Sequence, residues 1–256
     1  MPLAILTRPA GRNERIAQQL QDQGLAVMLA PALALQPLDG PMSAPDDFQL
    51  VIFVSRQAVQ QYFAHWDGRW PDGTWAAAVG QATAGALRDW VPAGQILAPS
   101  ARTTQDSEAL MALIRQQSIR PGRVLILRGD RGREWLSTQL GNEGWSVERR
   151  ALYRRDPVLW TRAQCLAAAA ARPCVLLLSS LDGLRAIAAS FQFHDLPWPE
   201  VLQVVAIHER IGRQLQYVLD AATPARVSRS LPGVNYCAPD EQAIFQAILT
   251  ASRLRC

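Results

Sequence analysis

The chain has 256 residues, 49% of them hydrophobic, so it can bury the core of one large domain or of two smaller ones. All 26 basic residues are Arg. The absence of Lys excludes Schiff-base chemistry, pyridoxal phosphate attachment and Walker-type nucleotide binding, which need a primary amine. The net charge of +4 favours an anionic partner. The Arg residues are spread out without a basic tail, so the signal for nucleic acid is weak and a small polyanion fits equally well.

The Cys and His residues are scattered, and their spacing matches neither a zinc site nor a disulfide framework. We therefore expect no metal. No apolar run reaches the roughly 18 residues of a membrane span, and residues 1–9 lack the pattern of a signal peptide. We expect a soluble, cytoplasmic protein with no membrane partner.

Short apolar segments alternate with amphipathic ones along the chain. Strands are predicted at residues 3–7, 25–29, 50–54, 75–79, near 96, and at 124–127, 146–147, 175–178 and 201–207. Helices are predicted at residues 13–23, 57–64, 82–90, 107–116, 134–142, 183–191, 211–219 and 241–254. Such alternation is typical of parallel sheets covered by helices, so we predict an α/β fold with a doubly wound parallel sheet.

An internal repeat divides this pattern. Residues 5–27 match residues 125–147 without a gap, and the identical pairs are Arg8/Arg128, Glu14/Glu134, Gln19/Gln139, Leu20/Leu140, Gly24/Gly144 and Val27/Val147. A looser match links residues 53–55 with 177–179, which each deliver a Ser to the start of a helix. The repeat predicts two similar α/β halves. Pro-rich stretches at 31–45 and near Pro157 indicate crossings between domains, but interleaved and consecutive domains both fit.

In open α/β sheets, ligands bind at the carboxyl ends of the strands. The candidate binding residues follow predicted strands, and they are Arg8, Ser55, Arg56, Thr83, Arg128, Gly129, Ser179, Ser180, His208 and Arg210. Hydroxyls, Arg side chains and helix N-termini suit carboxylates or phosphates.

Each candidate has a simpler interpretation. Ser55 and Ser179 fit helix N-caps, a role compatible with binding. The loop after Arg128 fits a solvated charged turn, and His208 fits a surface residue. There is no Gly-rich dinucleotide fingerprint and no nucleophile elbow. The residues alone thus indicate a two-domain α/β protein that binds a small anion.

The order and spacing of several motifs resemble the uroporphyrinogen-III synthase family over essentially the whole chain. These motifs are the segments 5–9, 53–55, 78–83, 107–110, 124–134, 151–154, 178–180 and 205–211. The family's Phe-Thr-Ser motif reads Phe-Val-Ser at 53–55 and Leu-Leu-Ser at 177–179, so a side-chain role for its middle residue does not carry over.

The resemblance implies two flavodoxin-like domains joined by a two-stranded connector. Residues 1–35 with 160–256 would form one domain and residues 45–150 the other, with 36–44 and 151–159 as the connector. It also implies a lyase that needs no cofactor and cyclises hydroxymethylbilane to uroporphyrinogen III, with a transient handover from hydroxymethylbilane synthase.

The resemblance further implies site roles. Ser55, Thr83 and Ser179 match polar cleft positions, and Tyr153 matches a cleft-facing tyrosine. We hypothesise that Tyr153 donates a hydrogen bond to the leaving hydroxyl, the alternative being a structural tyrosine that packs the connector. For the whole protein, the alternative is a non-enzymatic binding protein or sensor of a small polyanion.

Overall fold

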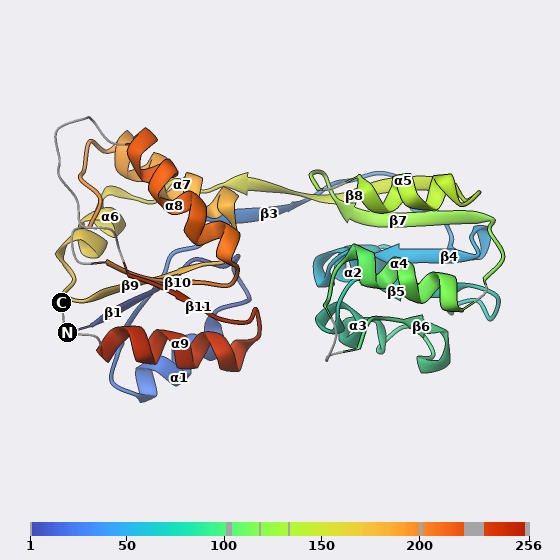
Figure 1. The fold of residues 1–256 in the computed structure, drawn as a ribbon, viewed down its shortest axis with the longest axis horizontal. Coiled ribbons are helices and arrows are strands. Elements are labelled where there is room, and N and C mark those ends of the chain that lie inside the picture. Colours follow the sequence, from blue (N-terminus) through green and yellow to red (C-terminus); the bar gives the residue numbers. More distant parts are fainter. Residues whose placement is uncertain are drawn as a thin grey trace. The chain divides into compact units, whose positions relative to one another are not determined.

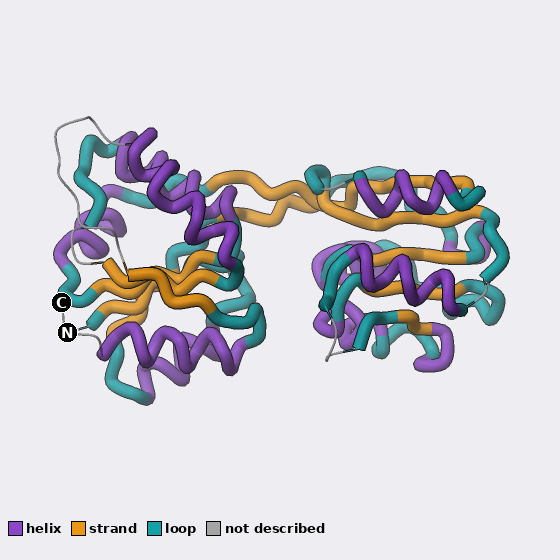
Figure 2. The backbone as a smooth tube through the Cα atoms, viewed as in Figure 1, coloured by secondary structure: helices purple, strands orange, loops and turns teal. Residues whose placement is uncertain are grey.

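The computed structural model describes residues 2–100, 104–117, 119–132, 134–199, 202–222 and 233–253. The chain divides into two compact units, of which unit 1 is Met1–Ala34 with Asp156–Cys256 and unit 2 is Leu35–Arg155. Each unit holds one sheet with helices on both faces (Figures 1 and 2).

Unit 1 is built on a five-stranded sheet in the order β11-β10-β9-β1-β2, and all its strand pairs are parallel. Its strands are β1 (Leu3–Leu6), β2 (Ala26–Leu29), β9 (Cys174–Leu178), β10 (Leu202–Ala206) and β11 (Gly233–Tyr236). Its helices are α1 (Glu14–Asp22), α6 (Arg162–Ala170), α7 (Leu181–Phe193), α8 (Glu209–Ala222) and α9 (Glu241–Arg253). Numbered along the unit, the strand order is the flavodoxin-like 2-1-3-4-5.

Unit 2 contains a six-stranded sheet in the order β3-β8-β7-β4-β5-β6. Its strands are β3 (Leu33–Pro37), β4 (Leu50–Phe53), β5 (Trp75–Ala78), β6 (Ile96–Leu97), β7 (Arg123–Gly129) and β8 (Ser146–Pro157). Its helices are α2 (Arg56–Phe63), α3 (Gln81–Leu87), α4 (Ser107–Gln116) and α5 (Trp135–Asn142). The five strands from β8 to β6 are parallel, and β3 is added at the edge beside β8.

Alternate residues of each central strand point to opposite faces, which gives each unit two hydrophobic clusters. In β1, Ile5 belongs to the cluster beneath α6, α7 and α8, whereas Ala4 and Leu6 belong to the cluster beneath α1 and α9 (Figure 1). In β4, Phe53 packs under α2 and α3, and Ile52 packs under α4 and α5. Burial on both faces explains why these strands are continuous apolar runs.

The internal repeat corresponds to β1-α1-β2 in unit 1 and β7-α5-β8 in unit 2. Gly24 and Gly144 follow the two helices with φ of +79° and +86°, a left-handed conformation that favours glycine. The remaining strands correspond as well, because β9, β10 and β11 occupy the places that β4, β5 and β6 take in the other sheet.

The predicted fold class is confirmed, but the alternating sequence pattern missed two strands and one α-helix. These are β3, α6 and β11, and β8 is far longer than the two residues expected. β3 and the end of β8 lie in the Pro-rich stretches interpreted as crossings, where Pro at the edge of a sheet does not prevent strand formation. Residues 201 and 254, at the ends of two predicted elements, lie outside the described residues. The predicted domain boundaries stay a prediction.

Candidate functional site

Each sheet has one point where the winding of the chain reverses. In unit 1 it lies between β1 and β9, and in unit 2 between β7 and β4. From each point the connections run outward in both directions, so their helices cover opposite faces of the sheet. Loops therefore separate at the carboxyl ends of these strands, which is where α/β proteins bind ligands.

Ser55 follows β4 at the reversal point of unit 2. Its Oγ accepts a hydrogen bond from the backbone N–H of Ala58 at 3.1 Å, which caps α2. The cap satisfies one of the N–H groups that a helix start leaves without an intrahelical partner. The side chain is only half-buried. Ser55 thus has the capping role, and part of the residue stays exposed.

A bulge in β8 places Tyr153 next to this serine. Arg128 pairs with Ala151 but Gly129 pairs with Tyr153, so the register shifts by one residue at Leu152. The extra residue breaks the alternation of the strand, and Leu152 and Tyr153 are both buried. A bulge of this kind redirects the side chain beside it.

Among the described residues, the tyrosine hydroxyl has two hydrogen-bond partners. Its Oη lies 2.9 Å from Oγ of Ser55 and accepts a hydrogen bond from Nη2 of Arg155 at 3.2 Å. The ring lies against Gly129, where an added Cβ would be 3.0 Å from Cε2 of the ring. Only 1% of Tyr153 is exposed. The phenol therefore sits behind Ser55 and Arg155 rather than at the surface.

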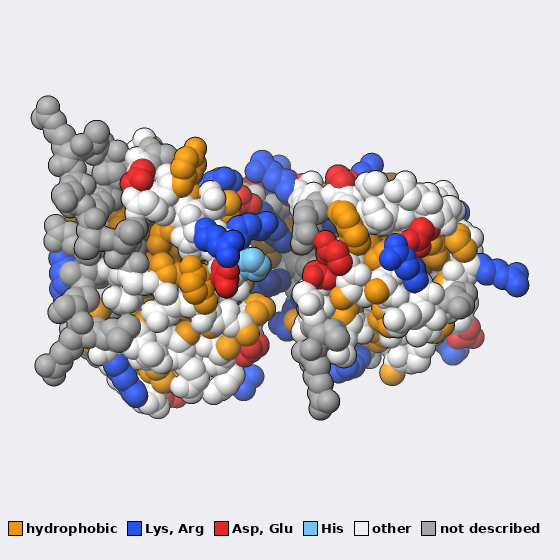
Figure 3. Space-filling model, in the orientation of Figure 1, with side chains coloured by type: hydrophobic (Ala, Val, Ile, Leu, Met, Phe, Trp, Pro, Cys, Tyr) orange, Lys and Arg blue, Asp and Glu red, His pale blue; other side chains and the backbone are white. Residues whose placement is uncertain are grey.

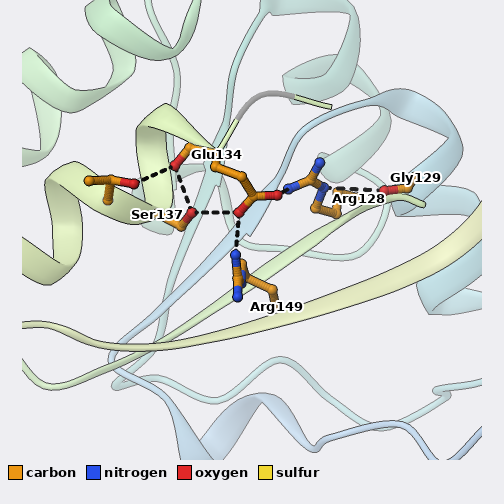
Figure 4. Close-up of polar contacts among 6 residues, drawn as sticks. Arg128, Gly129, Glu134, Ser137 and Arg149 are labelled. Carbon is orange, nitrogen blue, oxygen red and sulfur yellow. Dashed lines mark hydrogen bonds and ion pairs between the residues drawn. The ribbon is translucent and has the colours of Figure 1, made fainter. Parts of the chain in front are cut away.

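Arg128 is held in place at the end of β7 (Figure 4). Its Nη1 donates to Oε1 of Glu134 at 2.8 Å and its Nε donates to the carbonyl of Gly129 at 3.2 Å. The other Glu134 oxygen accepts from Arg149 and, at 3.2 Å, from Ser137. The hydrogen bonds from Arg149 and Arg128 lower the pKa of the Glu134 carboxyl. Two guanidinium groups share one carboxylate, so the cluster keeps a net positive charge.

The other two candidates of unit 2 lie at helix starts. Thr83 is in the first turn of α3 and is only 6% exposed. Its backbone N–H donates to the carbonyl of Gly80. Arg56 is the first residue of α2 and is exposed. Of the two, Arg56 presents its side chain to solvent.

Arg8 follows β1 at the reversal point of unit 1. Its side chain is 13% exposed and lies 3.8 Å from a Glu241 oxygen, and its carbonyl accepts from Nδ2 of Asn13 at 2.7 Å. Glu14, the repeat partner of Glu134, accepts instead from the N–H groups of Gly11 and Asn13. Hydrogen bonds from backbone N–H groups lower the pKa of its carboxyl.

Ser180, rather than Ser179, is the counterpart of Ser55. Strand β9 ends at Leu178, and Oγ of Ser180 caps α7 by accepting from the N–H of Gly183 at 3.0 Å. The predicted match of 53–55 with 177–179 is therefore wrong by one residue, and the predicted cap at Ser179 is wrong too. The sequence match aligned Leu178 with Val54, the residue between β4 and its capping serine, although Leu178 is still part of β9. An apolar run does not show at which residue its strand ends.

His208 and Arg210 lie at the start of α8, where both are exposed. The Nδ1 atom of His208 accepts a hydrogen bond from the N–H of Arg210 at 3.0 Å. Glu209 forms an ion pair with Arg213 one turn further along. Figure 3 shows basic and acidic side chains gathered over this turn. The His208 side chain therefore accepts from a first-turn N–H group of α8, a role that the sequence did not predict.

The structure brings together only part of the predicted set. In unit 2, Tyr153 contacts both Ser55 and Gly129. The residues of unit 1 are Arg8, Ser179, Ser180, His208 and Arg210. Arg155 was not among the predicted residues. It lies two residues after Tyr153, and residues two apart on a strand share a face, so this spacing in the sequence could have identified it.

Within the described part of the chain, no group of three or more His, Cys, Asp or Glu residues could hold a metal ion. Over the same residues, no helix has the length and apolar character needed to cross a membrane.

A family model described as uroporphyrinogen-III synthase HemD matches residues 14–227, which is most of the chain. The chain belongs to the uroporphyrinogen-III synthase family. The uroporphyrinogen-III synthase of Proteus mirabilis is 32% identical over 162 residues, or 59% of this chain and 79% of that protein. The enzyme of the same name from Escherichia coli K12 is 30% identical over 169 residues, or 62% of this chain and 68% of that protein.

Two solved structures share the fold of this family member. A mutant uroporphyrinogen III synthase from Thermus thermophilus has a TM-score of 0.61 at 14% identity and covers 98% of both chains. The Helicobacter pylori synthetase has a TM-score of 0.58 at 15% identity, covering 97% of this chain and 98% of its own. Two predictions are therefore confirmed, namely membership of the uroporphyrinogen-III synthase family and that the protein is an enzyme of this type.

Proposed function

We propose that this protein cyclises hydroxymethylbilane to uroporphyrinogen III, with loss of water and reversal of ring D. Membership of the family supports this activity. The substrate carries eight carboxylates, and the two reversal points offer Arg side chains, hydroxyls and helix N-termini that suit such groups.

The proposed reaction needs few catalytic groups from the protein. The terminal hydroxyl departs as water, and the resulting methylene is attacked by the substituted carbon of ring D. The spiro intermediate then fragments and closes again with that ring reversed. The pyrrole nitrogen supplies most of the driving electron density, so the protein needs only a weak acid and a fixed geometry.

The observation that carries the assignment of the acid is the contact between Tyr153 and Ser55 at 2.9 Å, at the N-terminus of α2. It joins a buried phenol to the hydroxyl of Ser55, a half-buried residue at the point where the fold favours ligand binding. Tyr153 is the source of the acidic proton for the departing hydroxyl in this proposal.

The remaining candidates bind substrate carboxylates in this proposal. They are Arg8, Ser55, Arg56, Thr83, Arg128, Gly129, Ser179, Ser180, His208 and Arg210. Arg128 is the best prepared, because Glu134 already holds its guanidinium at the end of β7. A preorganised cation loses less side-chain entropy when it binds a carboxylate.

Further aspects belong to the same proposal. The enzyme works as a cytoplasmic monomer without cofactor, metal, nucleic acid or membrane, and receives its substrate by transient handover from hydroxymethylbilane synthase. Its domains are residues 1–35 with 160–256 and residues 45–150, and 36–44 with 151–159 form the connector.

The test is to incubate the purified protein with freshly generated hydroxymethylbilane, oxidise the products and separate the type I and type III uroporphyrins. We expect mainly type III from the wild type and an approximately 100-fold slower formation from Tyr153→Phe. Tyr217→Phe is the matched control, because Tyr217 is 72% exposed on α8. Type I alone from the wild type, as without protein, would refute the activity.

A Tyr153→Phe variant with the full wild-type rate of type III formation would leave the activity standing and refute the role of the tyrosine. Circular dichroism of each variant checks that the fold is intact, since the lost hydroxyl is buried beside Ser55.

A further inference from the structure

The hydrogen bonds around Tyr153 have a direction that burial determines. The side chain is 1% exposed, and the described residues give its Oη two partners, Ser55 and Arg155. Arg is always a donor, so Arg155 donates to Oη. The phenol O–H also needs an acceptor, because a buried donor without one is strongly unfavourable.

Ser55 is the acceptor that satisfies this proton. Were Ser55 to donate to Tyr153, the phenol proton would have no acceptor among the described residues. When Tyr153 donates instead, Oγ of Ser55 accepts from both Oη and the N–H of Ala58, as two lone pairs allow. The serine proton is then given to neither partner, and Ser55 is half-buried whereas Tyr153 is buried.

We propose that Arg155, Tyr153 and Ser55 form a directed donor chain, in which Ser55 gives the proton to the leaving hydroxyl and Tyr153 and Arg155 act through it. This inference rests on the proposed function. It makes Ser55 the catalytic residue in contact with substrate, and it assigns positioning roles to Tyr153 and Arg155. Hydrogen bonds in such a chain polarise one another, which strengthens the terminal donor.

The step balances in protons and electrons. As the carbon–oxygen bond breaks, its electron pair leaves with the oxygen, which takes a proton from Ser55 and departs as water. Ser55 recovers a proton from Tyr153, and the phenolate left behind lies beside the Arg155 cation. When the closed ring regains aromaticity, it releases one proton, and the chain is reset.

Arg155 is placed for this role by the strand itself. It lies two residues after Tyr153 on β8, so both side chains lie on one face, and its guanidinium carbon is 5.6 Å from the centre of the tyrosine ring. Its exposed side chain retains N–H groups beyond the one given to Tyr153. Arg154 is exposed on the same strand and provides a matched control for the loss of one charge.

The first test compares Ser55→Ala, Tyr153→Phe and the double variant in type III formation. We expect kcat to fall about 100-fold in each single variant and little further in the double variant, with KM nearly constant, since the two residues act as a unit. Ser55→Thr should restore most of kcat. Thr161→Ala loses an equivalent helix cap, at the start of α6, and should keep wild-type kcat.

The second test removes the cation. Arg155→Gln should lower kcat about 10-fold in the wild type but have no effect in Tyr153→Phe, since its hydrogen bond is to the phenol. Arg155→Lys should recover part of the loss, and Arg154→Gln should keep kcat within about twofold.

The outcomes separate the two proposals. Wild type without type III product refutes the proposed function. An active wild type in which Ser55→Ala retains kcat while Tyr153→Phe loses it means direct contact of the tyrosine with substrate, and overturns the chain. An undiminished effect of Arg155→Gln in the Tyr153→Phe background overturns the role of Arg155.

Discussion

The reversal points of the two sheets have the same local backbone conformation at their capping serines. Ser55 and Ser180 adopt φ and ψ of −160° and 158° in the first case and −160° and 157° in the second. Each caps its helix by accepting from the N–H group three residues on. Each follows a central strand that pairs in parallel with the first strand of the internal repeat.

The two points differ in the side chains around the capping serine. In unit 2, the bulge of β8 places Tyr153 behind Ser55. In unit 1, a Cβ added at Gly183 would lie 3.0 Å from Oγ of Ser180 and 3.4 Å from Cβ of Ala32, so the nearby side chain there is that of an alanine. The same backbone conformation therefore places each capping hydroxyl among different side chains.

Gly129→Ala should damage the unit 2 site most. The added Cβ would lie 3.0 to 3.3 Å from ring and hydroxyl atoms of Tyr153, so the ring has to shift away from Ser55. We expect kcat for type III formation to fall about 10- to 100-fold.

Gly141→Ala on α5 is the control for this change, because its Cβ would meet nothing within 4 Å and should slightly stabilise the helix. If Gly129→Ala and Gly141→Ala have the same kcat, the position of the tyrosine ring does not matter for catalysis.

Ser180→Ala tests whether the unit 1 serine does chemistry. The lost cap should cost about 1 kcal/mol of stability, as at Ser55. Because no phenol is hydrogen-bonded to Ser180 among the described residues, we expect kcat within about twofold of wild type and a KM raised a few-fold, the result of a lost carboxylate contact. Steady-state kinetics and urea unfolding measure the two effects. A loss of kcat as large as in Ser55→Ala would show that the units do not differ in this way.

Gly24→Ala and Gly144→Ala should have the smallest effects, and equal ones. Both glycines have positive φ, and the nearest atom to an added Cβ is at 3.9 Å at Gly144 and beyond 4 Å at Gly24. The cost is therefore conformational, about 1 kcal/mol each, with kcat unchanged. Unequal shifts in the midpoint of urea unfolding would mean that the two copies of the repeat are not equivalent.

The sequence by itself determined the fold class, the two copies of the repeat and most helices and strands. Buried strands such as β4 and β9 carry apolar side chains on both faces, and helix starts carry capping residues, so these signals are local. The position of Ser55 after a predicted strand made it a candidate, and the family resemblance added Tyr153, which is far away in the chain.

Only the tertiary structure decided how those candidates meet. The bulge at Leu152, the stacking of Tyr153 on Gly129 and the Arg155 hydrogen bond depend on the register between β7 and β8, which no local pattern specifies. The same holds for the correction from Ser179 to Ser180, since the end of β9 is set by its pairing with β10. Pairing between strands distant in sequence fixes these contacts. Local sequence patterns therefore predict the helices, the strands and the candidate residues, whereas tertiary packing determines which of those residues meet.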